Sequence, residues 1–444
     1  MRLIPTIPDE AFVFLGRAEP ARERPRGNEG SPNGAQRSQA GVGMSSRIYF
    51  DHSATTPLDP RVLEAMAPFL GGAYGNPSSL HQEGRVARAA VDRARAQVAT
   101  LIGATQAEII FTASGTEADN LALIGAVRAS GKSGHVVTSA IEHAAILETC
   151  KFLASGGTKI THLPVDTEGL VRPDGLLRAL QSTVTVVSVM AANNVVGTIQ
   201  PIEELAQLTK LHGVLFHTDA VQAGGKIPLD VNRVQVDLLS LSAHKLHGPK
   251  GVGALYIRKG AQLSPIVFGG GQERGLRSAT ENVAGIVGFG AAAELARKEL
   301  TEEAARLAGL REYIAAEILR NFPQAYLFGH PTERLPGHLS LGFRGQEREV
   351  GKLLEALDQA GAAVSAGSAC SANHSGEPSS VLLAMGYDAE SARGLIRISL
   401  GRFNTQHEVD RFLDVLSSAV SALPAAAVSA SLPGLANPAE VAFA

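Results

Sequence analysis

The sequence predicts an α/β fold in which a large domain with a mostly parallel sheet is followed by a smaller α+β domain. From Ile48 onward, helical patterns alternate with short runs that are apolar along their whole length. Strands of that kind are typical of a sheet that helices cover on both faces. After about residue 300 this alternation gives way to one long helix and then to mixed strands and helices.

The composition of the 444 residues excludes several classes of protein. Hydrophobic residues make up 45% and charged residues 19%, as in a chain with an ordinary folded core. A net charge of −3 argues against nucleic acid as a direct partner. Two cysteines, Cys150 and Cys370, cannot form a disulfide framework and favour a reducing compartment, so a cytoplasmic location is predicted. No apolar run approaches the roughly 18 residues that span a membrane.

The two ends of the chain differ from its middle. Residues 1–46 are rich in Pro, Gly, Ser and Gln without periodicity, which predicts a disordered extension, with an interaction arm as the alternative. Acidic residues among its arginines argue against a transit peptide, and Met44 is a candidate natural start. We expect a large cofactor-binding domain over 47–300, whose first segment contributes to the small domain. The small domain is expected over 301–424, and a flexible tail over 425–444.

Hydrophobic periodicity predicts the elements in order. Val86 to Ile102 has the period of an amphipathic helix, with arginines on one face and Val86, Ala90, Val91, Ala94 and Val98 on the other. A helix around Cys150 places that thiol near its apolar face, and a long helix over Thr301 to Asn321 opens the small domain. Short apolar runs predict buried strands at Glu108–Thr112, Val136–Thr138, Val184–Met190, Val214–Thr218 and Val236–Leu241.

Polar residues follow several of these strands, at the edge where open α/β sheets bind ligands. Asp219 ends one strand, and Lys245 follows the next one, before a Gly-Pro-Lys-Gly turn. The two could form a simple salt bridge, but the lysine could also form a Schiff base with a cofactor whose ring nitrogen the carboxylate keeps protonated. The small-residue turn between Phe111 and Asn120 suits an anion at a helix N-terminus. Thr116 and Glu117 could instead be an ordinary N-cap pair.

Several motifs stand along the chain in a fixed order. They are Arg47–Pro57, Tyr74–Ser79, Phe111–Asn120, Glu142–His143, Asn193–Asn194, His217–Gln222, Ser242–Gly251, Gly269–Thr280, Ser365–Cys370 and Arg397–Arg402. Together they resemble the cysteine desulfurases of the NifS and IscS group. These are class V aminotransferase-like, fold-type I enzymes that use pyridoxal 5′-phosphate. The resemblance runs from Arg47 to about residue 421.

The resemblance implies a role for each matching residue. Lys245 forms the internal aldimine, Asp219 pairs with the pyridine nitrogen, and His143 stacks on the ring and handles protons. Asn194 and Arg397 hold the substrate carboxylate, for which a planar guanidinium is suited, and Asn194 also lies beside the cofactor. The remaining cofactor contacts are Gly115, Thr116, Ser242 and His244 at the phosphate, Gln222 at the ring hydroxyl, and Thr280 at the phosphate of the partner subunit in a homodimer.

Cys370 does most to name the reaction. Its small and polar neighbours predict a mobile, exposed loop, which is a poor place for a structural thiol. The resemblance implies that Cys370 takes the sulfur of L-cysteine as a persulfide, with release of L-alanine. The sulfur then passes to acceptor proteins such as an iron–sulfur scaffold. No resident metal is expected, although Cys370 is a candidate ligand for a transferred iron–sulfur cluster.

Two other functions compete with this one. A selenocysteine lyase or another class V relative would not require Cys370, because selenium can leave without a persulfide-forming thiol. A catalytically silent subunit of a sulfur-transfer assembly would not need Lys245, Asp219, His143 and Cys370 together. Val195 stands where relatives often have an acidic residue, and the C-terminal end does not resemble a scaffold-docking tail. The identity of the sulfur acceptor therefore stays open.

Overall fold

The computed structural model describes residues 47–131, 134–366 and 377–423. The predicted N-terminal extension with Met44, the tail over 425–444 and Cys370 lie outside these residues. Within the described ranges, none of the helices combines the length and the apolar character that a membrane crossing requires.

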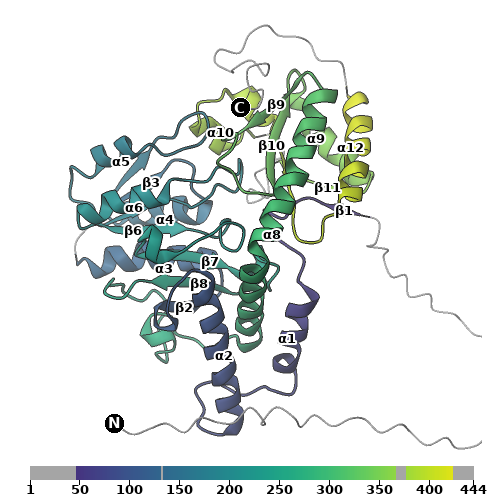
Figure 1. Ribbon diagram of the computed structural model, residues 1–444. Helices are drawn as coiled ribbons and strands as arrows, with labels where there is room; N and C mark the ends of the chain where they lie inside the picture. Colours follow the sequence, from purple (N-terminus) through teal and green to yellow (C-terminus); the bar gives the residue numbers. More distant parts are fainter. Residues whose placement is uncertain (1–46, 132–133, 367–376, 424–444) are drawn as a thin grey trace, which may run out of the picture. The chain divides into compact units, whose positions relative to one another are not determined.

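The largest sheet has seven strands in the order β2-β8-β7-β6-β5-β3-β4 (Figure 1). In this sheet β8 runs antiparallel to β2 and β7, and the strands from β7 to β4 are parallel to one another. Five of these strands coincide with the predicted apolar runs, which confirms a mostly parallel sheet. The bounds are β2 (Ile109–Thr112), β3 (His135–Ser139), β4 (Lys159–Leu163), β5 (Val186–Ser188), β6 (Leu215–Asp219), β7 (Leu238–Ser242) and β8 (Gly253–Ile257).

Both faces of this sheet are buried, and neighbouring residues on a strand pack on opposite sides. Val136 and Leu238 belong to the core that contains α3 (Gly115–Ala129) and α4 (Ala144–Ser155). Val137 and Leu239 belong to the other core, with α2 (Gln82–Leu101), α6 (Ile202–Leu211) and the N-terminal part of α8 (Val283–Asn321). Because side chains alternate along a strand, a run that is apolar throughout supplies both cores.

The helix predicted over Val86 to Ile102 is α2, but its buried face is shifted. Ala87, Val91, Ala94 and Val98 are buried, whereas Val86 is 44% exposed. Residues of a helical face recur every three or four positions, and Val86 falls one position before that series. The arginines of α2 do not all point to solvent, because Arg95 is buried.

One arginine of α2 is buried in an ion pair. Arg95 donates to the Glu273 carboxylate through both terminal nitrogens, at 2.7 and 2.6 Å, and both side chains are almost fully buried. A fork-to-fork pair of this kind satisfies both charged groups without water. It ties α2 to η5 (Glu273–Gly275) in the Gly269–Thr280 segment.

Two small sheets and a second core are formed by residues from both ends of the folded part. β9 (Ala325–Phe328), β10 (His338–Phe343) and β12 (Ile396–Ser399) form an antiparallel sheet. β1 (Ile48–Tyr49) pairs in parallel with β11 (Ala362–Ala363). Ile48 and Phe50 are buried in this core together with Phe412 of α12 (Gln406–Ser421).

The long helix α8 belongs to both cores. Phe289 packs beside the large sheet and Ile314 packs in the second core, and Figure 1 shows the helix running from α1 (Pro60–Leu70) and α2 toward β10. The helix predicted from Thr301 therefore begins 18 residues earlier, and the proposed domain boundary at residue 300 falls inside it. The division into two domains stays a prediction.

The remaining elements connect these layers. The short helices are α5 (Pro173–Ala179), α7 (Val231–Val234), α9 (Val350–Gln359), α10 (Ser380–Ala384) and α11 (Ala389–Arg393). The other 3-10 turns are η3 (Gln106–Glu108), η4 (Ala243–Lys245) and η6 (Glu347–Glu349).

Cys150 is 1% exposed within α4, which confirms that it is a packing residue, and burial raises the pKa of its thiol to about 12.

Candidate active site

A cavity of about 810 Å³ lies at the carboxyl edge of the large sheet. It gathers the predicted residues because β2, β3, β5, β6 and β7 all point their carboxyl ends to this edge. Ten predicted site residues line it: Gly115, Thr116, His143, Asn194, Asp219, Gln222, Ser242, His244, Lys245 and Arg397. Their individual roles stay predictions.

Lys245 is held by the backbone of the N-terminal segment. It lies in η4, directly after β7, and its Nζ donates to the carbonyl oxygens of Ser53 and Ala54 at 2.6 Å each. The backbone of His244 is held by a side chain of the same segment, because Thr56 Oγ1 donates to its carbonyl oxygen at 2.9 Å. The segment after β1 therefore sets the position of the lysine amine.

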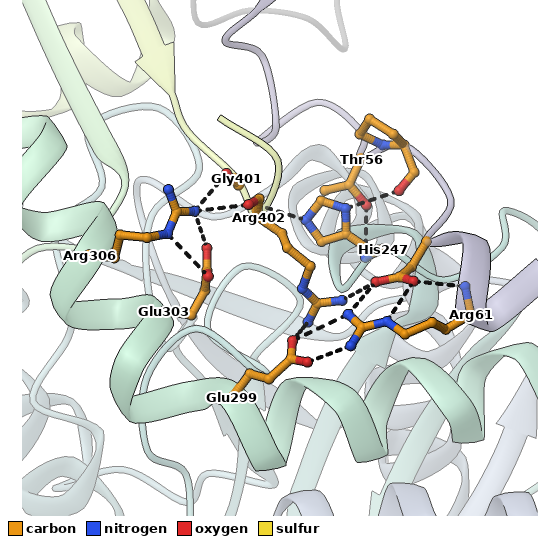
Figure 2. Close-up of polar contacts among 10 residues, drawn as sticks. Thr56, Arg61, His247, Glu299, Glu303, Arg306, Gly401 and Arg402 are labelled. Atoms are coloured by element: carbon orange, nitrogen blue, oxygen red, sulfur yellow. Dashed lines mark hydrogen bonds and ion pairs between the residues drawn. The ribbon is translucent and has the colours of Figure 1, made fainter. Parts of the chain in front are cut away.

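A polar network anchors the turn that follows Lys245 (Figure 2). The Asp59 carboxylate is 1% exposed and accepts from Arg61 and Arg402, and these arginines hold its pKa well below the usual range despite its desolvation. Glu299 of α8 pairs with both arginines. His247 donates its amide to Thr56 Oγ1 at 2.8 Å. The network joins the N-terminal segment, the lysine turn, α8 and the end of β12.

Asp219 fits a cationic ring nitrogen. It is the last residue of β6, is 5% exposed, and its Oδ1 accepts from the Val221 amide at 2.9 Å. Burial raises the pKa of this carboxyl, and the nearby His143 and Lys245 act in the opposite direction. A buried carboxylate at the wall of a cavity gains most from a ligand that brings a positive charge.

The start of α3 fits a phosphate. Ser114 is the N-cap, and its Oγ accepts from the Glu117 amide at 3.1 Å, so the N-cap interpretation of Thr116 and Glu117 is wrong. The amides of the first helical turn have no acceptor within the helix and carry partial positive charge. A Cβ at Gly115 would lie 2.7 Å from a methyl carbon of Val221, so only glycine fits at this approach to the cavity.

His143 is positioned by α4. It is the N-cap of that helix, and its Nδ1 accepts from the Ala145 amide at 3.1 Å. The capping bond uses Nδ1, and His143 lines the cavity. The cap thus fixes the plane of a ring that the resemblance assigns to stacking.

Two buried acids in the cavity wall were given no role by sequence reasoning. Glu142 accepts from the Met190 amide at 2.9 Å and from Ser139 Oγ, and burial raises its pKa to about 8. Burial and the neighbouring Asp219 raise the pKa of Asp119 well above its usual value. Glu142 Oε2 and Asp119 Oδ1 are buried without a hydrogen-bond partner in the described part. Their place within the Glu142–His143 and Phe111–Asn120 motifs was the available signal.

Arg397 is 1% exposed, and its guanidinium contacts Asp51 and the backbone of Asn194. Its Nη2 pairs with Asp51 at 2.8 Å, and its Nη1 donates to the Asn194 carbonyl oxygen at 2.9 Å. Asp51 was not predicted as a site residue, although it belongs to the Arg47–Pro57 motif. The pair orients the guanidinium at the wall of the cavity, and it places Asn194 next to Arg397.

Two predicted residues are not brought into this cavity by the described structure. Thr280 is exposed and does not line the cavity, and its predicted partner is a second subunit. In the same segment Arg277 is already paired with Glu117 at 2.7 Å. Cys370 lies outside the described residues, but Ser365 exchanges backbone hydrogen bonds with Arg397, and Glu377 lines the cavity. Both flanks of residues 367–376 thus lie beside the site.

No group of three or more His, Cys, Asp or Glu side chains in the described ranges is arranged to hold a metal ion. The cavity wall thus provides helix amides that suit a phosphate, a carboxylate that suits a protonated ring nitrogen, and a lysine amine. These three features are the ones through which a pyridoxal 5′-phosphate group is held in a protein.

Comparisons with known proteins agree with this geometry. "Cysteine desulfurase IscS" of Dictyoglomus turgidum is 48% identical over 381 residues, covering 86% of this chain and 96% of the relative. The protein of the same name from Methanosarcina thermophila is 46% identical over 377 residues, covering 85% and 92%. A solved NifS-like protein superposes with a TM-score of 0.78 at 42% identity, covering 85% and 100%. "SspA in complex with cysteine" gives 0.71 at 35% identity, covering 81% and 100%.

These similarities confirm the predicted fold-type I architecture and the use of pyridoxal 5′-phosphate. The model of the aminotransferase class-V family matches residues 48–412, which is most of the chain and all of the elements that build the cavity. By this match and by its relatives, the chain belongs to the aminotransferase class-V family.

Proposed function

We propose that this protein is a cysteine desulfurase that converts L-cysteine to L-alanine and places the sulfur on Cys370. The observation that carries the proposal is the cavity in which Lys245, Asp219 and Arg397 meet, in a chain nearly half identical to proteins named cysteine desulfurase. A solved relative described as a complex with cysteine supports the choice of substrate.

The described residues can supply the acid–base and binding groups that this reaction needs. Pyridoxal 5′-phosphate, when bound, acts as an electron sink for the bond between the substrate α-carbon and its hydrogen. Lys245 Nζ removes the proton from that carbon, and Asp219 keeps a proton on the ring nitrogen. The amides at the start of α3, with Ser242 and His244, hold the phosphate. Gln222 donates to the ring oxygen, and His143 covers the ring.

Substrate binding rests on the pair that Arg397 forms with its surroundings. The guanidinium accepts no further proton and is held by Asp51, so its fork is oriented before the substrate carboxylate arrives. Asn194 completes that contact. A side chain that is oriented in this way before the substrate binds loses less conformational entropy on binding.

Cys370 takes the sulfur. Its thiolate attacks the substrate sulfur, the carbon–sulfur bond breaks, and the electron pair remains with the carbon fragment. That fragment gains a proton and leaves as L-alanine. L-Cysteine and one enzyme thiol thus give L-alanine and one enzyme persulfide, with no other oxidant or reductant.

Three further features belong to this proposal. The exposed Thr280 segment is expected to complete the phosphate site of a second copy, which makes the active form a homodimer. The persulfide is expected to pass to sulfur-acceptor proteins such as an iron–sulfur scaffold, as the name of the IscS relatives suggests. The cytoplasm is the expected location.

The deciding experiment compares the wild-type enzyme with Cys370→Ser. Both should bind the cofactor and L-cysteine, but only the wild-type enzyme should release L-alanine, because a hydroxyl is a far weaker nucleophile toward sulfur than a thiolate. Mass spectrometry after brief exposure to L-cysteine should find the added sulfur on the peptide that contains Cys370. Undiminished alanine release by Cys370→Ser would contradict the persulfide step and favour a lyase of the selenocysteine type.

A further inference from the structure

A second lysine lies behind the candidate active site and has no assigned role. Lys226 is mostly buried in the turn after β6, where it lines a small cavity of about 60 Å³ together with Lys245 and His52. Its Nζ donates to Gln222 Oε1 at 3.1 Å. In the described part of the chain no carboxylate lies within ion-pair distance of this amine. A buried lysine without a counter-ion is costly and therefore uncommon.

The contact with Lys226 determines which way the Gln222 amide points. Lysine nitrogen in its charged form can only donate, so the atom facing it must be Oε1. At the other end of the amide, Nε2 donates to the Ser53 carbonyl oxygen at 2.9 Å, and a carbonyl can only accept. The two partners together allow one orientation of the side chain. The same Ser53 oxygen also accepts from Lys245 at 2.6 Å.

This orientation has a chemical consequence at the large cavity, whose wall includes Gln222. Oε1 is directed to Lys226, and Nε2 has a second N–H beyond the one that Ser53 accepts. The side chain is only 6% exposed, so the amide has little room to exchange its ends. Gln222 therefore offers the cavity a hydrogen-bond donor. An acceptor at the same place would repel an anionic oxygen.

We propose that Lys226 is a positioning residue: it holds the Gln222 amide so that Nε2, and not Oε1, faces the ring oxygen of the bound cofactor. This inference rests on the proposed function. Lys226 itself touches neither substrate nor cofactor in it. The donor at the ring oxygen favours the ionised form of that oxygen, and it contributes to the pH at which the bound cofactor changes its protonation.

The charges around Lys226 are consistent with such a role. Burial, followed by the positive charges of Lys245 and Arg397, lowers the pKa of Lys226 to about 7. Lys226 in turn lies close enough to His52, His244, His247 and His338 to lower the pKa of each, although burial is the larger cause. These four histidines are therefore neutral near pH 7, and the positive charge beside Gln222 comes from lysine and arginine side chains.

The test is a pH titration of the visible absorption of the cofactor-loaded enzyme. Lys226→Met removes the donor to Oε1 and leaves the Ser53 carbonyl oxygen as the remaining contact that orients the amide, so the titration midpoint should rise by roughly 0.5 to 1 pH unit. Lys226→Ala serves the same purpose if the methionine variant does not fold. Lys210→Met is the matched control, because Lys210 donates to Gln235 Oε1 in a pair of the same chemistry on the surface. Its midpoint should not move.

A double-mutant cycle separates positioning from a simple loss of charge. Gln222→Leu should raise the midpoint by itself, and adding Lys226→Met to it should cause no further rise. A full additional shift in that background would show that Lys226 acts by its charge alone and would overturn the inference. So would an unchanged midpoint in Lys226→Met that still binds the cofactor.

Failure of the inference differs visibly from failure of the proposed function. A wild-type enzyme without the visible band, or without alanine release from L-cysteine, contradicts the proposed function. A wild-type enzyme that shows both, with variants whose midpoints do not move, contradicts only the role of Lys226.

Discussion

Replacing Glu142 by glutamine should stabilise the protein at neutral pH and have little effect at pH 5. Glu142 is 4% exposed, and burial raises its pKa from 4.5 to about 8. In the unfolded chain the same carboxyl ionises near its ordinary pKa. Between these two values the folded protein binds more protons than the unfolded one, so the free energy of unfolding falls as the pH rises. Glutamine has the same shape without the charge and removes this loss.

The size of the effect follows from the two pKa values. A difference of about 3.5 units corresponds to about 5 kcal/mol above pH 8, about 3 kcal/mol at pH 7 and less than about 1 kcal/mol at pH 5. The entropy of unfolding, at roughly 2.1 cal/mol/K per residue over roughly 370 residues, is about 0.8 kcal/mol/K. The increase in Tm caused by Glu142→Gln should therefore be about 3 °C larger at pH 7 than at pH 5.

The assay is thermal unfolding of wild type and Glu142→Gln in matched buffers from pH 5 to pH 8. The Tm difference should widen as the pH rises and level off near pH 8. Glu204→Gln, at an exposed position on α6, is the control and should show a constant difference. A Glu142→Gln difference that stays constant with pH, or a variant less stable than wild type at pH 7, would show that Glu142 is ionised in the folded protein.

Three further outcomes are expected. Lys245→Ala should lose the lysine-linked cofactor band and all turnover while keeping its sedimentation behaviour, and a reducible lysine-linked cofactor in this variant would contradict the assignment. Asp59→Ala removes the buried carboxylate between Arg61 and Arg402 and leaves Arg402 with Glu299 as its counter-ion, so the free energy of unfolding should fall by about 1.5 to 3 kcal/mol in denaturant titration; a loss below about 1 kcal/mol would argue against the network of Figure 2. Cys150→Ser should lower this free energy by about 1 to 3 kcal/mol, since it buries a hydroxyl, with alanine release unchanged.

The parts of the fold that the sequence predicted are those in which local pattern and burial agree. The five apolar runs form strands whose alternate side chains pack into two different cores. A run that is apolar throughout is typical of a strand that is buried on both faces of its sheet. The polar residues after those runs met at one edge for the same topological reason. Both inferences depend on neighbours along the chain.

The start of α8 illustrates what local pattern does not contain. Its first turns hold Gly285, Gly288 and Gly290, which weigh against a helix, and they are buried on nearly all sides, so no amphipathic period appears. A Cβ at Gly288 would lie 2.5 Å from the sulfur of Met66 in α1, and one at Gly290 would lie 2.6 Å from the backbone of α2. The glycines are explained by helices that pack against them.

The same limit applies to the site residues that were missed. Three contacts are visible only in the structure. They are the pairing of Asp51 with Arg397, the pairing of Glu273 with Arg95 outside the cavity, and the contact of Lys226 with Gln222. The first two partners are 346 and 178 positions apart in the sequence. Charge pairing over such distances is a property of the tertiary fold, and no single-sequence pattern carries it.

The segment that follows β1 also governs when the site can exist during synthesis. Its carbonyl groups accept from Lys245, and Asp51 pairs with Arg397. The contacts of the site therefore join residues that are synthesised early with residues that are synthesised late. The separation of 346 residues between Asp51 and Arg397 takes roughly 17 to 70 s to translate, at about 5 to 20 residues per second. A ribosome-bound chain that lacks β12 therefore has Lys245 but not Arg397, the arginine that we propose binds the substrate carboxylate. The cavity wall is therefore completed only after β12 has been synthesised.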